Sequence, residues 1–171
     1  MEILIVGFIL VGLMVYASTR IKRSAAQAFE AESIDASEFT IEKPEGFLYV
    51  LNGDRSLAFE AYSKEMGEGT ASKFRAARAE LRVYENRTLD YACEAIEQTT
   101  TIRTSRSEVI DGQKYRVMEG TSAQKETDFR ETYKIAEKNG RVFEFKLLVL
   151  ETAVAEIVIR GEKLLESFSL K

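Results

Sequence analysis

The sequence predicts an α+β domain, an antiparallel β-sheet with helices packed on it, behind an N-terminal transmembrane helix. Three observations lead there: an uncharged stretch at the N-terminus, alternating apolar runs joined by tight-turn dipeptides, and two segments with helical apolar spacing. The 171 residues are 45% apolar and 30% charged, which fits one globular domain with a sizeable core.

The N-terminal stretch, residues 3–19, reads ILIVGFILVGLMVYAST and holds no charge. As a helix it would be about 25 Å long, slightly short for a bilayer unless Tyr16 lies at the headgroups and Arg20 snorkels. We expect residues 1–19 to be an uncleaved anchor in the lipid bilayer. The alternative is a cleaved signal peptide, but no cation precedes the stretch and three follow it.

These three cations, Arg20, Lys22 and Arg23, predict the orientation. Lys and Arg beside a spanning helix are retained on the cytoplasmic side, so we expect a single-pass protein whose C-terminal domain is cytoplasmic; an extracytoplasmic domain is the alternative. Residues 20–37 are rich in Ala, Glu and Ser and are expected to be a juxtamembrane helix or linker. The soluble domain then covers residues 38–171.

The first half of this domain begins with a short strand, residues 38–41, that stops at a turn containing Pro44 and Gly46. Two further strands are expected within residues 56–64 and 79–86. Thr88 can cap a helix over residues 89–100, and Asp90 in its first turn complements the helix dipole.

The second half is predicted to be two hairpins and a closing helix, residues 152–168. Asp111-Gly112 and Asn139-Gly140 are strong hairpin signals because both turn residues need positive φ. Strands 105–110 and 128–138 should therefore pair with 113–120 and 141–151. We expect one inward row on each strand of the last hairpin: Phe129, Glu131, Tyr133 and Ile135, matched by Phe143, Phe145, Leu147 and Val149.

The order of these parts resembles the PsbP-like α/β/α sandwich superfamily, which includes the photosystem II extrinsic subunit PsbP and DcrB-type bacterial proteins. The residues that carry the resemblance are FTIEKPEGF at 39–47, LRVYENRTLD at 81–90, EKNGRVFEF at 137–145 and SFSL at 167–170. The resemblance covers residues 38–171 and implies a non-catalytic binding or assembly module. Many members work outside the cytoplasm, which opposes the orientation predicted from charge.

The composition excludes much catalytic chemistry. There is no histidine, and the only cysteine, Cys93, lies on the apolar face of the predicted helix beside Ala92 and is expected to be a buried structural thiol. No catalytic, cofactor-binding or metal-ligating residue is predicted.

Four cations, Lys73, Arg75, Arg78 and Arg82, are weak candidates for contact with lipid headgroups or a partner, although nearby glutamates dilute them. Without residues 1–28 the chain holds 21 basic and 27 acidic side chains, a net charge of −6, so we expect no nucleic-acid binding.

Two carboxylates on the last hairpin, Glu131 and Glu144, are expected to point to opposite faces and thus not to form an acid–base pair. Glu131 lies on a mostly apolar row, where an acid is either at the edge or buried with a partner.

The sequence therefore predicts a membrane-tethered, non-catalytic protein-interaction or complex-assembly module with an unidentified protein partner. The alternative is a small-ligand binder or an enzyme using carboxylate or Tyr chemistry in a pocket between sheet and helices.

Overall fold

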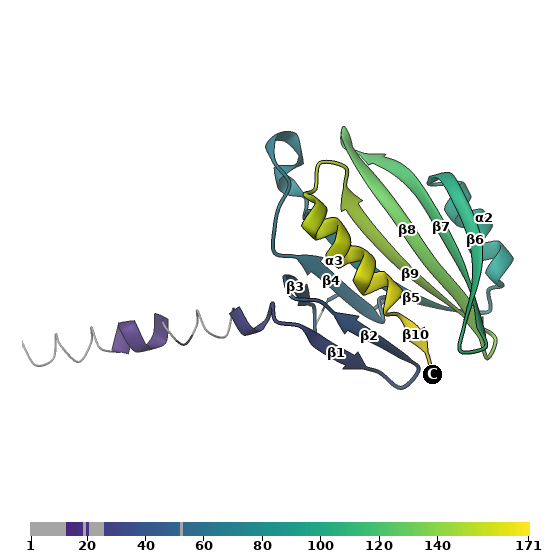
Figure 1. Ribbon diagram of the computed structural model, residues 1–171, viewed down its shortest axis with the longest axis horizontal. Coiled ribbons are helices and arrows are strands. Elements are labelled where there is room, and N and C mark those ends of the chain that lie inside the picture. Colours follow the sequence, from purple (N-terminus) through teal and green to yellow (C-terminus); the bar gives the residue numbers. More distant parts are fainter. Residues whose placement is uncertain (1–12, 19, 21–25, 52) are drawn as a thin grey trace, which may run out of the picture.

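The structure is a computed structural model that describes residues 13–18, 20, 26–51 and 53–171. Figure 1 shows antiparallel strands with helices packed on them, as the sequence predicts, but the strands form two sheets rather than one. A seven-stranded sheet has the order β3-β4-β5-β9-β8-β7-β6, and a three-stranded sheet has the order β1-β2-β10.

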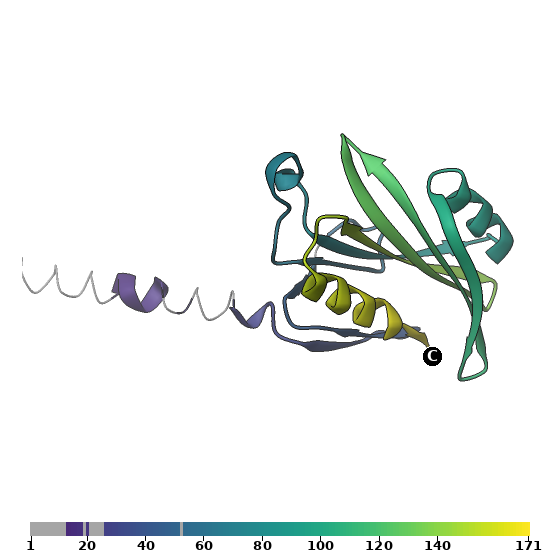
Figure 2. The ribbon, with the colours of Figure 1, turned by 45° about the horizontal axis from the view of Figure 1, so that its top comes forward.

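The large sheet contains β3 Phe47–Tyr49, β4 Phe59–Ser63, β5 Ala77–Glu85, β6 Thr101–Ile110, β7 Gln113–Gln124, β8 Thr127–Lys138 and β9 Arg141–Leu150. The small sheet contains β1 Glu32–Asp35, β2 Phe39–Lys43 and β10 Ser169–Leu170. The helices are α2 Leu89–Glu97, α3 Ala155–Glu166 and the short 3-10 helix η1 Gly69–Lys73. α3 and the small sheet cover one face of the large sheet, and α2 lies on the other (Figures 1 and 2).

The local signals in the sequence produce the expected turns and cap. Asp111 and Gly112 have φ values of 51° and 79°, and Asn139 and Gly140 have φ values of 53° and 74°. The last hairpin starts with Lys138 opposite Arg141, as counted from its turn. Thr88 Oγ1 accepts a hydrogen bond from the Tyr91 amide, so the predicted cap of α2 is confirmed.

The prediction that the two apolar rows of the last hairpin point to the same face of the sheet was wrong. Glu131 lies opposite Leu148 and Thr132 opposite Leu147, so Leu147 lies on the other face from Glu131 and Tyr133. Both rows are nevertheless buried, because the sheet is covered on both sides. Tyr133 packs in the cluster beneath α2, whereas Leu147 packs beneath α3.

α3 lies close to the sheet at Gly161, where an added Cβ would be 3.2 Å from Leu147. This explains a glycine inside a helix, since a larger residue would push the helix away from β9. Beyond the end of α3, the buried Lys134 amine donates to the carbonyls of Glu166 and Phe168 at 2.9 and 2.7 Å. Burial lowers the pKa of this amine, which also lies 4.8 Å from the Tyr115 ring centroid.

The helix expected up to the start of the domain was wrong for residues 32–35, which form β1. Ile34 lies opposite Ile41 of β2 and packs against the main core. Pairing with β2 and burial of Ile34 thus outweigh the helix propensity of the Ala and Glu residues.

The predicted anchor, residues 1–19, falls largely outside the described residues, as do Lys22 and Arg23. Residues 13–18 are helical, and Tyr16 and Arg20 are exposed. In the part of the chain that the structure describes, no helix is long and apolar enough to span a membrane.

Candidate functional site

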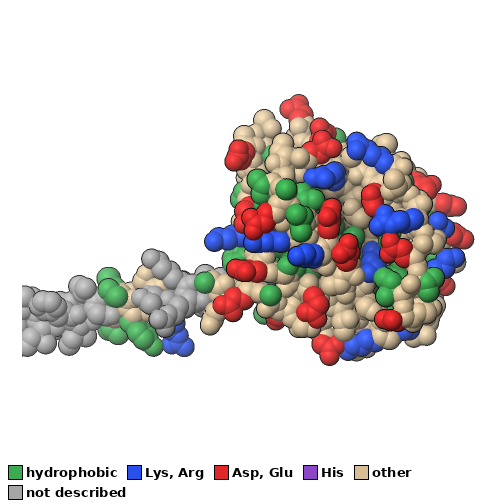
Figure 3. All heavy atoms as spheres, viewed as in Figure 1, with side chains coloured by type: hydrophobic (Ala, Val, Ile, Leu, Met, Phe, Trp, Pro, Cys, Tyr) green, Lys and Arg blue, Asp and Glu red, His purple; other side chains and the backbone are tan. Residues whose placement is uncertain are grey.

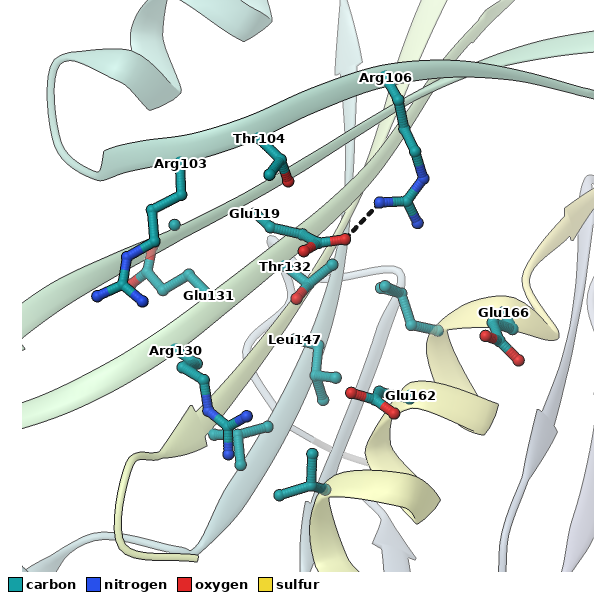
Figure 4. A pocket seen from close by; sticks show the side chains of 14 residues that line it. Arg103, Thr104, Arg106, Glu119, Arg130, Glu131, Thr132, Leu147, Glu162 and Glu166 are labelled. Atoms are coloured by element: carbon teal, nitrogen blue, oxygen red, sulfur yellow. Dashed lines mark hydrogen bonds and ion pairs between the residues drawn. The ribbon is translucent and has the colours of Figure 1, made fainter. Parts of the chain in front are cut away.

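An open groove of about 420 Å³ lies between α3 and the outer strands of the large sheet. Figure 4 shows side chains reaching into it from β6, β7 and β8 on one side and from α3 on the other. Its lining comprises Arg103, Thr104, Arg106, Glu119, Gly120, Arg130, Glu131, Thr132, Leu147, Val149, Val158, Glu162, Leu165 and Glu166.

The groove exists because the two helices cover different parts of the sheet. α3 packs on β5 and β9, while α2 packs on β8 and β9 from the opposite face. On its side of the sheet, α3 lies mainly over β5 and β9 and meets β8 at its C-terminal end, where Lys134 donates to the Glu166 carbonyl. The rest of β8 and the strands β6 and β7 form the open wall of the groove. Their side chains there are mostly polar, whereas the floor beside α3 is apolar and formed by Leu147, Val149 and Leu165.

The walls of the groove carry opposite charges. The sheet contributes Arg103 and Arg130, both exposed, and α3 contributes Glu162 and Glu166. Among the described residues, none of these four side chains forms an ion pair. Charged groups left apart across an apolar floor are suited to a ligand that brings the complementary charges.

Arg106 differs from these groups because it is already paired. Its guanidinium contacts Glu108 at 2.8 Å and also pairs with Glu119, as drawn in Figure 4. Arg106 is thus held in place on the outer wall, and Arg103 and Arg130 are the unpaired cations among the described residues of the groove.

Beside the groove lies a buried polar cluster centred on Glu131, whose side chain is 2% exposed. Its carboxylate accepts hydrogen bonds from Thr100 Oγ1 and Ser122 Oγ, each at 2.6 Å, and from the Tyr133 hydroxyl. Lys146 Nζ is 2.9 Å away. Of the two sequence expectations for Glu131, burial with partners is therefore the correct one.

This environment sets the charge of Glu131. Burial opposes its ionisation, but the hydrogen bonds from Ser122, Thr100 and Tyr133 and the charge of Lys146 outweigh burial and lower its pKa. The pKa of Tyr133 is raised by burial and by its hydrogen bond to Glu131. The cluster is a satisfied ionised carboxylate rather than a proton donor, so it points to a structural role.

Gly120 of β7 allows the segment after α2 to approach this cluster. A Cβ at Gly120 would lie 2.5 Å from the Thr101 carbonyl oxygen and 2.8 Å from Thr100 Cγ2. The bare backbone at Gly120, directly opposite Glu131, therefore lets Thr100 reach the carboxylate.

The expectation that Glu131 and Glu144 point to opposite faces was wrong. Glu144 lies opposite Ile135, which shares a face with Glu131, while Lys146 lies between them opposite Tyr133. Burial raises the pKa of Glu144 despite Arg82 and Lys146 nearby. Because Lys146 is paired with Glu131, the two carboxylates do not form a proton-sharing pair.

The basic residues singled out in the sequence lie away from the groove. Arg78 pairs with Glu60 at 2.8 Å and with Glu80 at 3.0 Å, and Arg82 pairs with Glu80 at 3.1 Å. Their side chains follow β5 on the face opposite α3, and each is already neutralised within the chain.

The other two do not join them in one cluster. Arg75 lies over the ring of Tyr62 at 4.4 Å, and Lys73 is exposed at the end of η1. On the face seen in Figure 3, acidic and basic side chains are interspersed rather than gathered by sign.

Cys93 is half-buried beside the cluster under α2, and burial raises the pKa of its thiol. This agrees with a structural thiol, because the reactive thiolate form is disfavoured.

Sequence reasoning missed all four unpaired groups of the groove. Arg103, Arg130, Glu162 and Glu166 come from three elements that are distant in sequence, and each is an ordinary charged residue in its own segment. The only usable signal was the charged side of the closing helix.

Comparison with solved structures identifies the fold. The solution structure of cyanobacterial PsbP (CyanoP) from Synechocystis sp. PCC 6803 matches with a TM-score of 0.56 and 11% identity, over 84% of this chain and 94% of that chain. The chain has the PsbP-like fold.

Two further structures match this PsbP-like domain equally well. LpqN of Mycobacterium tuberculosis, involved in cell envelope biogenesis, has a TM-score of 0.56 and 9% identity, over 83% of this chain and 91% of that chain. The Ran-binding protein Mog1p of Saccharomyces cerevisiae has a TM-score of 0.55 and 9% identity, over 83% and 96%. No protein-family model and no curated protein matches the sequence. Identities this low establish the fold alone.

Proposed function

We propose that the chain is a membrane-tethered, non-catalytic protein-interaction or assembly module that binds a segment of a partner protein in the groove between α3 and β6–β8. The observation that carries this proposal is the set of unpaired charges on its two walls, Arg103 and Arg130 opposite Glu162 and Glu166, above an apolar floor.

The groove is a better candidate for the binding site than the basic residues of β5, because those residues are already paired with glutamates. Arg78 and Arg82 already have glutamate partners, so a ligand would have to displace ion pairs to reach them. Arg103 and Arg130 have none among the described residues, so a partner carboxylate would add an ion pair without breaking one. The fold supports this function indirectly, since the PsbP-like protein Mog1p is Ran-binding.

Tethering and sidedness are proposed from the sequence. The uncharged residues 3–19 form the anchor, and Arg20, Lys22 and Arg23 hold the domain on the cytoplasmic side. The full-length chain should remain in the membrane pellet after carbonate washing, with its N-terminal peptide attached. A C-terminal alkaline phosphatase fusion should be inactive and a green fluorescent protein fusion should be fluorescent; an active phosphatase would place the domain on the extracytoplasmic side.

Photo-crosslinking from the groove tests the binding function. A benzophenone side chain at position 158 replaces Val158 in the groove, and the same group at position 159 replaces Ile159, which is exposed. We expect a discrete adduct with another protein in intact cells from position 158 and none from position 159. Arg130→Glu should reduce the position-158 adduct at least tenfold, and equal adducts from both positions would contradict the proposal.

A second candidate, a small-molecule binder, is favoured by the size of the groove. Its volume of about 420 Å³ falls within the roughly 300–1,000 Å³ of ligand pockets. The charged walls would then hold a zwitterion. Binding of Glu-Lys dipeptides to the wild type but not to Arg130→Glu, together with no adduct from position 158, would favour this candidate.

A further inference from the structure

β6 forms an uncovered edge of the large sheet. It pairs only with β7 among the described strands, and seven of its ten residues are exposed. α3 packs mainly on β5 and β9, and α2 packs mainly on β8 and β9. α2 also lies beside Ser105 on one face of β6, but no described strand pairs with the outer edge of β6. An antiparallel strand directs alternate backbone N–H and C=O groups away from its single partner, and such a row is a template for another strand.

The edge also carries an exposed apolar side chain, Val109, which is 70% exposed. β6 has two features that usually hinder the pairing of an edge strand with another strand. These are a bulge between Ile102 and Thr104 and the charges of Arg106 and Glu108. Beyond the bulge, however, the strand from Thr104 to Ile110 pairs regularly with β7 and can accept a neighbour on its other side.

Symmetry limits how a second copy of β6 could add to this edge. In an antiparallel pair of strands, residues opposite each other have side chains on the same face of the sheet. A two-fold axis between two copies of β6 must therefore place one residue opposite the same residue of the second copy. An axis at Arg106 would place two arginines together, and an axis at Glu108 would place two glutamates together. Both registers are disfavoured by like charge.

An axis at Ser107 gives the complementary register. Arg106 then lies opposite Glu108 of the second copy, and Glu108 lies opposite its Arg106. Since Arg106 and Glu108 already contact each other at 2.8 Å within one chain, the four charges would alternate around the axis. Ser105 and Thr104 would face Val109 and Ile110 of the second copy, which gives the exposed Val109 side chain a neighbour.

We propose that the β6 edge binds a second copy of this chain, antiparallel and centred on Ser107, so that two seven-stranded sheets become continuous. A two-fold axis perpendicular to the sheet keeps the two grooves on the same side. The dimer therefore presents two grooves together, but its formation does not depend on what the grooves bind.

Cysteine crosslinking tests the register. In the full-length chain carrying Cys93→Ala, Ser107→Cys should form a disulfide with its own copy, because opposite Cα atoms in an antiparallel pair are about 4.5–5.5 Å apart, within disulfide range. Ser105→Cys is the control, since two such residues would be displaced by four positions, roughly 13 Å. We expect the dimer to form at least ten times faster with Ser107→Cys.

Ser105→Cys combined with Val109→Cys should restore crosslinking, because these residues face each other in the proposed register. Equal rates for Ser105→Cys and Ser107→Cys would indicate random collision and overturn the register. A Ser107→Cys chain that forms no disulfide would overturn the proposal.

Charge exchange gives an independent readout by sedimentation of the full-length chain. Arg106→Glu and Glu108→Arg should each weaken the dimer at least tenfold, because each places like charges opposite one another. The double variant restores opposite charges and should recover the dimer. A double variant as weak as the single ones, or a wild-type chain that stays monomeric at 100 μM (about 2 mg/ml), would contradict the proposal. Loss of the position-158 adduct would leave these results unaffected.

Discussion

Replacing Glu131 with Gln should destabilise the domain strongly, because this variant keeps the size of the side chain and removes its charge. The carboxylate accepts three hydrogen bonds and pairs with Lys146 while 2% exposed. Hydrogen bonds to a charged group are each worth about 1.5–3 kcal/mol, and breaking a buried ion pair costs about 3–5 kcal/mol. These contributions overlap, and Lys146, 26% exposed, stays partly hydrated. We expect a loss of about 3 kcal/mol at pH 7.

The pH dependence follows from the lowered pKa of Glu131. A carboxyl group whose folded pKa lies below its unfolded value stabilises the fold above the unfolded pKa, about 4.3 for Glu, and loses that contribution as pH falls through the folded pKa. Urea unfolding should therefore show the full difference between wild type and Glu131→Gln at pH 7 and a smaller one below pH 4.

The matched control is Glu144→Gln, on the same face of the adjacent strand. Because burial raises the pKa of Glu144, its charge is not favoured by folding, and the variant should be as stable as wild type or slightly more stable at pH 7. A Glu131→Gln variant within 0.5 kcal/mol of wild type, or a difference that stays constant with pH, would refute the reasoning.

Three further predictions concern packing and reactivity. Phe145→Ala and Leu164→Ala should each cost about 3 kcal/mol in urea unfolding, because both side chains are 0% exposed in the main core; shifts under 0.5 kcal/mol would contradict this. Gly120→Ala should cost about 1–3 kcal/mol through its clash with Thr101, whereas Gly140→Ala, in open space at φ 74°, should cost only its backbone strain of about 1 kcal/mol. Cys93 should react with a thiol reagent at pH 7.5 at least tenfold more slowly in the folded than in the urea-unfolded chain, and equal rates would mean that it is not protected.

Features set by neighbouring residues could be predicted from the sequence. The turns at Asp111-Gly112 and Asn139-Gly140 and the Thr88 cap depend on backbone conformations within four residues. The order of the strands and helices and the positions of the turns resemble PsbP-like domains, and this resemblance likewise predicted the correct fold.

Features set by distant elements could not be predicted. The two-residue turn at Asn139-Gly140 fixes the register that places Glu131 opposite Leu148, but a register does not say which face of the sheet is buried. Both faces of β8 and β9 are covered, so each face carries an apolar row. The sequence pattern was therefore interpreted as two rows on one face, although they lie on opposite faces. The sequence did not predict β1 for a related reason. Ile34 is partly buried only through its contacts with β2 and the main core, which lie elsewhere in the sequence.

The groove depends on the width of the sheet, which no local pattern encodes. Seven strands at a spacing of about 4.8 Å span roughly 29 Å, whereas a helix with its side chains is about 10 Å wide. One helix on each face therefore cannot cover the sheet, even with the small sheet beside α3, and the two faces are left open over different halves. An open half must be polar, and its charges can be paired within the chain or left for a ligand. β5 has the first arrangement, with Arg78 bound to Glu60, and the outer half has the second at Arg103 and Arg130. The partner binding that we propose is therefore placed on the outer half, where a partner's charges would add ion pairs without displacing any.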